Sequence, residues 1–82
     1  MRYLVEFAID LAAFPGEARQ QIEKTMEQIA EVVSTVPPSS PFWTSMKESV
    51  LQIDVEGVRI DYRIDRARGQ IRVIEAQKIR RP

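Results

Sequence analysis

Residues 58–65 read Val-Arg-Ile-Asp-Tyr-Arg-Ile-Asp, which is the most regular alternation in the chain. Apolar side chains stand at the even positions and charged side chains at the odd ones. Because successive residues of a strand point to opposite faces, this pattern predicts a strand with one face on a core and the other in solvent. We therefore expect a sheet that is covered on one side and polar on the other.

The flanking sequence predicts three more strands. Glu56-Gly57 has the composition of a tight turn and joins residues 58–65 to an earlier strand over 50–55. A second turn, over 66–69, ends in Gly69, which is free to adopt a positive φ, and leads into a last strand over 70–76 and a basic tail over 77–82. Residues 2–9 alternate in the same way and predict a strand near the N-terminus.

A helix is predicted between the first two strands, from Glu17 to about Val36. Apolar residues recur there at steps of three and four, as on a helix that covers one face of a sheet. Pro15-Gly16 precedes this segment and Pro37-Pro38 ends it. After a proline-rich loop, Phe42 and Trp43 are expected to close the edge of the core.

These elements predict an α+β fold. We expect one long helix packed on a four-stranded, mainly antiparallel sheet in the order β-α-β-β-β, as a single domain over 1–82. Leucine, isoleucine, valine and phenylalanine make up 23 of the 82 residues, above the fraction of about 20% below which disorder prevails.

The composition excludes several classes of protein. The chain has no cysteine and no histidine, which removes disulfide scaffolds, thiolate metal sites, catalytic triads and zinc hydrolases. Three glycines do not supply a phosphate-binding glycine-rich loop. We expect no metal site and no cofactor. No signal sequence or membrane span is visible, so we expect a cytoplasmic protein.

The formal charge of zero conceals an asymmetry. Residues 1–57 hold four basic and nine acidic side chains, a balance of −5, whereas residues 58–82 hold eight basic and three acidic, a balance of +5. Seven of those eight bases are arginine, which suits planar contacts with phosphate. The pattern is typical of a surface that binds a polyanion, and equally of an ordinary charged sheet face.

The C-terminal third resembles the RelE/ParE superfamily of toxins from bacterial toxin–antitoxin pairs. The resemblance lies in Gly57 before Arg59, Tyr62 three residues later, and a basic cluster, Lys78-Ile79-Arg80-Arg81, after the final strand. The preceding order of strand, helix and loop agrees, so the resemblance covers nearly the whole chain.

The resemblance implies a toxin that cleaves messenger RNA in the ribosomal decoding site without a metal ion, and that an antitoxin protein silences. Basic residues would orient the phosphate, and the RNA would supply its own 2′-hydroxyl as nucleophile. Carried over to this sequence, the candidate catalytic residues are Arg59, Arg80 and Arg81. The candidate RNA- and phosphate-binding residues are Lys78, Arg63 and Arg72. Tyr62 matches a structural tyrosine of the core.

Other functions remain open because the sequence departs from the nuclease pattern. Gln52 and Asp54 stand where nuclease members carry basic residues, no tyrosine follows the basic cluster, and Arg59 has Asp54 as an alternative cross-strand partner. The first alternative is a catalytically silent interaction domain on the same fold, with the helix or a strand edge as contact surface. The second is a ParE-type gyrase inhibitor. A free strand edge would also allow a homodimer.

Overall fold

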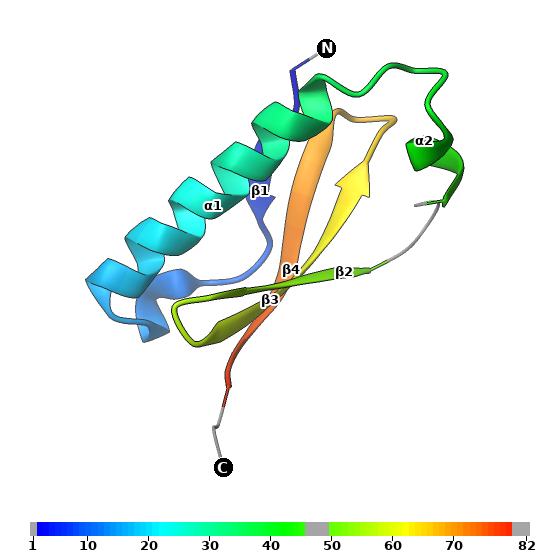
Figure 1. Ribbon diagram of the computed structural model, residues 1–82. Coiled ribbons are helices and arrows are strands. Elements are labelled where there is room, and N and C mark those ends of the chain that lie inside the picture. The colour runs from blue at the N-terminus through cyan, green and yellow to red at the C-terminus, as the bar shows by residue number, and fades with distance from the viewer. Residues whose placement is uncertain (1, 46–49, 80–82) are drawn as a thin grey trace.

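The computed structural model of the protein describes residues 2–45 and 50–79. In chain order the elements are β1 (Leu4–Phe7), the 3₁₀ turn η1 (Leu11–Ala13), α1 (Gly16–Ser34), α2 (Pro41–Ser45), β2 (Leu51–Val55), β3 (Val58–Asp65) and β4 (Gln70–Lys78). The strands of this described part form one four-stranded sheet in the order β1-β4-β3-β2, and α1 lies across one face of it (Figure 1). The predicted α+β fold is confirmed.

The sheet is mixed, with antiparallel pairing dominant. β2 pairs with β3 and β3 with β4 in antiparallel fashion, as expected of strands joined by short turns. β1 pairs with β4 in parallel. The crossover through α1 allows this arrangement, because the chain returns over the sheet before β2 begins.

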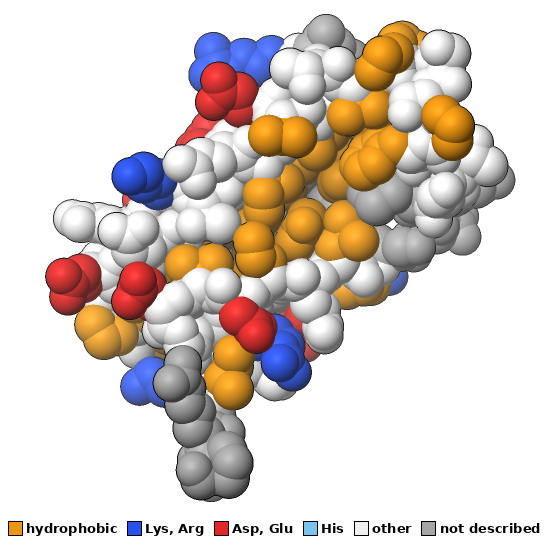
Figure 2. All heavy atoms as spheres, in the orientation of Figure 1, with side chains coloured by type: hydrophobic (Ala, Val, Ile, Leu, Met, Phe, Trp, Pro, Cys, Tyr) orange, Lys and Arg blue, Asp and Glu red, His pale blue; other side chains and the backbone are white. Residues whose placement is uncertain are grey.

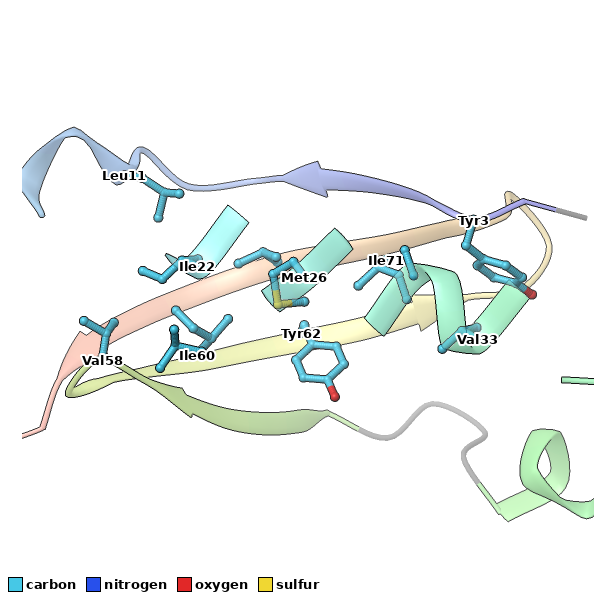
Figure 3. Packing of buried hydrophobic residues seen from close by; sticks show 12 residues of the cluster. Tyr3, Leu11, Ile22, Met26, Val33, Val58, Ile60, Tyr62 and Ile71 are labelled. Atoms are coloured by element: carbon cyan, nitrogen blue, oxygen red, sulfur yellow. The ribbon is translucent and has the colours of Figure 1, made fainter. Parts of the chain in front are cut away.

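The core lies between α1 and the sheet (Figure 3). Its fully buried side chains are Ile22 and Met26 of α1, Ile60 of β3, and Ile71 and Val73 of β4. No polar or charged residue is buried among the described residues. The inward positions predicted for β3 are confirmed, since Val58, Ile60 and Tyr62 are buried and Ile64 packs against them.

The turn between β2 and β3 has the left-handed geometry that its short length requires. Glu56 has φ 50° and Gly57 φ 73°, so both central residues lie in the region typical of a type I′ turn. In the next turn Gly69 adopts φ 64°, as expected. The two turns place β2, β3 and β4 side by side.

Several element boundaries differ from the prediction. β1 is shorter than residues 2–9, and α1 ends at Ser34 rather than near Val36. β4 continues past Ala76 to Lys78 because Lys78 still pairs with Val58 of β3. Lys78 therefore belongs to the sheet and not to a tail.

The aromatic residues after the proline-rich loop close one end of the core, as predicted. They form the short helix α2, which the sequence pattern did not indicate. The ring of Trp43 stacks on Tyr3 with 5.8 Å between centroids, and its Nε1 donates a 2.9 Å hydrogen bond to the carbonyl of Pro37. The guanidinium of Arg66 lies over the same ring, 4.9 Å from its centroid. These contacts join the loop to both β1 and the β3–β4 turn.

One irregularity interrupts the pairing of β3 with β4. Asp61 lies opposite Glu75 while the next residue, Tyr62, lies opposite Val73, which leaves Ile74 as an extra residue in β4. Because of this bulge, Val73 and Ala76 both face α1 although they are three residues apart.

Candidate functional site

The sheet face that points away from α1, called the open face here, carries three of the six predicted site residues. Arg59 and Arg63 lie on β3 and Arg72 lies on β4, and all three side chains are exposed. Period-two alternation places them there, because the alternate residues, such as Ile60 and Tyr62, point into the core. These three arginines thus share one surface.

On that surface, the side chain of Arg59 already forms an ion pair within the protein. Its Nε donates a 3.1 Å hydrogen bond to Oδ1 of Asp54, which lies directly opposite on β2. The hydrogen bond and the negative charge of Asp54 raise the pKa of Arg59 above its ordinary value. The guanidinium keeps its charge, but one of its N–H donors is hydrogen-bonded to the carboxylate of Asp54 and is not free for a ligand.

Lys78 does not join Arg59. It lies opposite Val58, whose side chain is buried on the helix side of the sheet. Residues directly opposite on paired strands point to the same face, so Lys78 and Arg59 lie on opposite faces. Arg80 and Arg81 lie outside the described residues.

Arg63 and Arg72 lie directly opposite each other on β3 and β4, and we call them the arginine pair. Side chains in such positions have Cβ atoms about 5 Å apart, and like charges there repel. Glu6 of β1 offsets part of this repulsion, with 3.8 Å between its Oε1 and Nε of Arg72. No described acidic side chain forms a salt bridge with Arg63.

The open face offers no tyrosine for proton transfer within the described part of the chain. Tyr3 and Tyr62 are both buried on the helix side, and burial raises the pKa of each phenol. A neutral phenol that is buried on the other side of the sheet cannot transfer a proton to or from a phosphate bound by the arginines of the open face.

A second surface is an apolar groove between α1 and β2, of about 520 Å³. Figure 2 shows it as a band of hydrophobic side chains between these elements, with charged side chains at its margins. None of its lining residues is charged: Thr25, Gln28, Ile29, Val32 and Val33 from α1, Val36 just after it, Phe42 from α2, and Leu51, Ile53, Tyr62 and Ile64 from the sheet. Val32 leaves 65% of its surface exposed at the rim.

Sequence reasoning missed this groove, although a signal was present. Thr25, Gln28 and Val32 follow one another at steps of three and four and so share one flank of α1, and Val36 continues this spacing just past the end of the helix. The other flank carries Glu23, Glu27 and Glu31. This flank lies beside the buried residues of α1 and carries no charge, although 29% of the residues of the chain are charged. Such a flank indicates an apolar surface.

The described residues hold no group of His, Cys, Asp and Glu side chains that could bind a metal ion. In the same part of the chain, no helix has the length and hydropathy to cross a membrane. Comparisons with protein-family models, curated proteins and solved structures found no match.

Proposed function

We propose that the chain is a RelE/ParE-type toxin of a bacterial toxin–antitoxin pair, and that its open face binds RNA. The element order and the positions of Gly57, Arg59 and Tyr62 on the β2–β3 hairpin support the assignment to this class. The arginine pair is the observation that carries the RNA contact.

The charge of the arginine pair favours a bound phosphate. Two guanidinium groups held side by side by strand pairing repel each other, and a phosphate between them turns this repulsion into attraction. Arg63 is the stronger ligand of the two, because Glu6 lies near Arg72. The planar guanidinium suits bidentate contact with phosphate oxygens.

Cleavage of the bound RNA needs more than the arginine pair. Arg59, Arg80 and Arg81 are the groups proposed to stabilise charge on the reacting phosphate, and Lys78, which lies on the opposite face of the sheet from Arg59, is not among them. Arg59 must exchange Asp54 for the phosphate to do so, which lowers its effectiveness. We therefore propose binding as the principal role of the open face and slow, metal-independent cleavage as its chemistry.

Binding is tested with a labelled single-stranded RNA, titrated by fluorescence anisotropy at several salt concentrations. The double variant Arg63→Gln/Arg72→Gln should weaken binding at least about tenfold and lower the salt slope by about 1.4, the value for two lost phosphate contacts on a single strand. Arg19→Gln, on the exposed surface of α1, removes one positive charge elsewhere and is the control. Equal affinities for the double variant and the control would exclude the arginine pair as the RNA site.

Toxicity is tested by expressing the chain alone and following growth, transcript integrity and ribosome-bound cleavage by primer extension. Growth arrest with cut transcripts supports the ribosomal nuclease. Arrest with intact transcripts and inhibited DNA supercoiling by purified gyrase identifies the ParE-type activity instead. Normal growth contradicts the toxin assignment.

The apolar groove favours a second candidate, a catalytically silent interaction domain. An amphipathic segment of an antitoxin protein would place its apolar face against Ile29, Val32 and Leu51. In a toxin the same contact would hold the activity silent, so the groove is compatible with both candidates.

The partner contact is tested with Val32→Glu, which adds a charge at the exposed rim of the groove. The variant should fold normally and lose a co-expressed antitoxin in affinity purification. Leu4→Glu makes a similar change at a residue that is 62% exposed on β1, away from the groove, and should retain the partner. Retention by both variants would exclude the groove.

A further inference from the structure

Among the strands that the structure describes, β2 is an edge strand with a hydrogen-bonded neighbour on one side only. The turn Glu56–Gly57 has two residues, so the flanking pair Val55 and Val58 exchanges both backbone hydrogen bonds. Hydrogen-bonded and non-hydrogen-bonded pairs alternate along the two strands from there. The backbone N–H and C=O groups of Leu51, Ile53 and Val55 therefore point toward β3. The N–H and C=O groups of Gln52 and Asp54 consequently point outward to the free edge.

Within the described part of the chain, this edge carries little protection against pairing. Folded proteins block exposed edges with charged side chains, above all lysine, and with proline, bulges, short strands or covering segments. The one charged side chain of β2, Asp54, is paired with Arg59 of β3. β2 reads Leu-Gln-Ile-Asp-Val, contains neither proline nor lysine, and pairs with β3 without a bulge. Gln52 and Asp54 are exposed, so a strand can reach them.

We propose that a second copy of the chain pairs with this edge, β2 to β2 and antiparallel, about a two-fold axis at Ile53. In this register Gln52 lies opposite Asp54 of the second copy, and the outward backbone groups of the two residues are in position to exchange hydrogen bonds. The two sheets then join into one sheet of eight strands. Both α1 helices lie on the same side of it, because the axis is perpendicular to the sheet.

The charges on the open face favour this register. A row across the junction reads Arg59, Asp54, then Gln52 and Asp61 of the second copy, so each Asp54 has a guanidinium on one side and an amide on the other. An axis at Asp54 would instead place two carboxylates directly opposite each other, which is unfavourable. The formal charge of zero also removes long-range repulsion between two copies.

The helix side of the junction is apolar in the same register. Ile60 and Ile53 of one copy meet Ile53 and Ile60 of the other, so an isoleucine row crosses the axis. The apolar grooves of the two copies then face each other along the new central strands. Because β2 has only five residues, the contact is small, and we expect a dissociation constant on the order of 10–100 μM.

Sedimentation equilibrium of the purified chain over a range of concentrations on both sides of that value tests the proposal. The wild type should pass from monomer to dimer. Gln52→Glu should weaken dimerisation at least about tenfold, because the new carboxylate meets Asp54 of the second copy. Gln52→Lys should strengthen it for the opposite reason. Gln20→Glu makes the same change as the first variant on the exposed surface of α1 and should dimerise like the wild type.

A chain that stays monomeric throughout this range would overturn the proposal, and so would a dimer that responds equally to changes at Gln52 and Gln20. The result is independent of the proposed function, because neither RNA binding by the arginine pair nor growth arrest enters the measurement.

Discussion

At the residue scale, Arg59 and Arg63 show how neighbours decide what a side chain can do. Both project from β3 onto the open face, four residues apart. Arg59 lies opposite Asp54 and donates a hydrogen bond to it, whereas Arg63 lies opposite Arg72. Burial is similar and residue type is the same, so cross-strand pairing alone separates an occupied guanidinium from one that is available to a ligand.

Ile60 should be among the most costly residues to truncate. It is fully buried against α1, and Ile60→Ala removes its packing and leaves a cavity, which should lower the free energy of unfolding by about 2–5 kcal/mol. Val32→Ala, at a side chain that is 65% exposed, should change it by less than about 0.5 kcal/mol. Urea denaturation measures both, and equal losses would show that the core is not where the structure places it.

Tyr62 should make stability fall at alkaline pH. Burial raises the pKa of its phenol because the phenolate would be poorly solvated. Tyrosines of the unfolded chain titrate near pH 10, so the unfolded state loses its proton first, and the free energy of unfolding decreases as pH rises through the folded pKa. Tyr62→Phe should reduce the loss between about pH 8 and pH 11 in urea denaturation; an unchanged loss would assign it to other groups.

At the scale of elements, the β2–β3 hairpin sets the positions of both surfaces. Its type I′ turn fixes the register of the two strands, in which Asp54 lies opposite Arg59. In the same register the backbone N–H and C=O groups of Gln52 point to the free edge. Glu56 adopts φ 50° in this turn, although residues with a Cβ atom are strained there. The hairpin register therefore outweighs a local backbone preference.

Glu56→Asn should stabilise the protein by about 0.5–1 kcal/mol, because asparagine tolerates the left-handed conformation of a type I′ turn. Glu56→Ala removes the same charge without this tolerance and should give no gain. Thermal unfolding of the two variants makes the comparison. A gain shared by both would assign the effect to the charge of Glu56 and not to the backbone.

At the scale of the whole molecule, Trp43 connects segments that are far apart in the sequence. Its ring stacks on Tyr3, next to β1, and the guanidinium of Arg66 from the β3–β4 turn lies over it. Its Nε1 donates a hydrogen bond to the carbonyl of Pro37 in the loop after α1. Nearby, Oγ of Ser34 accepts a 2.9 Å hydrogen bond from the backbone N–H of Tyr3. The end of α1, the start of β1 and the loop are thus joined at one end of the core.

Because Trp43 is the single tryptophan of the chain, its fluorescence reports on this junction. We expect the fluorescence and far-ultraviolet circular dichroism transitions in urea to coincide, as in a two-state domain of this size. Arg66→Ala should shift the two transitions together. A fluorescence change at lower urea than the loss of circular dichroism would show that the loop detaches before the sheet unfolds.

Much of the fold follows from the sequence because its signals are local. The alternation in 58–65, the turn at Glu56–Gly57 and the apolar spacing of α1 each act over a few residues, and the structure confirms them. The predicted end of β4, at Ala76, was wrong, because Lys78 pairs with Val58, a residue 20 positions earlier in the chain. The bulge at Ile74 is likewise set by the facing strand.

The sequence by itself determined the element order, the apolar face of each strand and the concentration of arginine in the last third, since residue type and period carry this information. Tertiary structure decided which charges meet. It formed the pair of Asp54 and Arg59, which the sequence offered as one alternative, and it placed Arg63 beside Arg72 and Lys78 on the other face, because the partner of a side chain depends on strand order and register. It also opened the groove between α1 and β2, since a groove exists only where two elements lie side by side without filling the space between them.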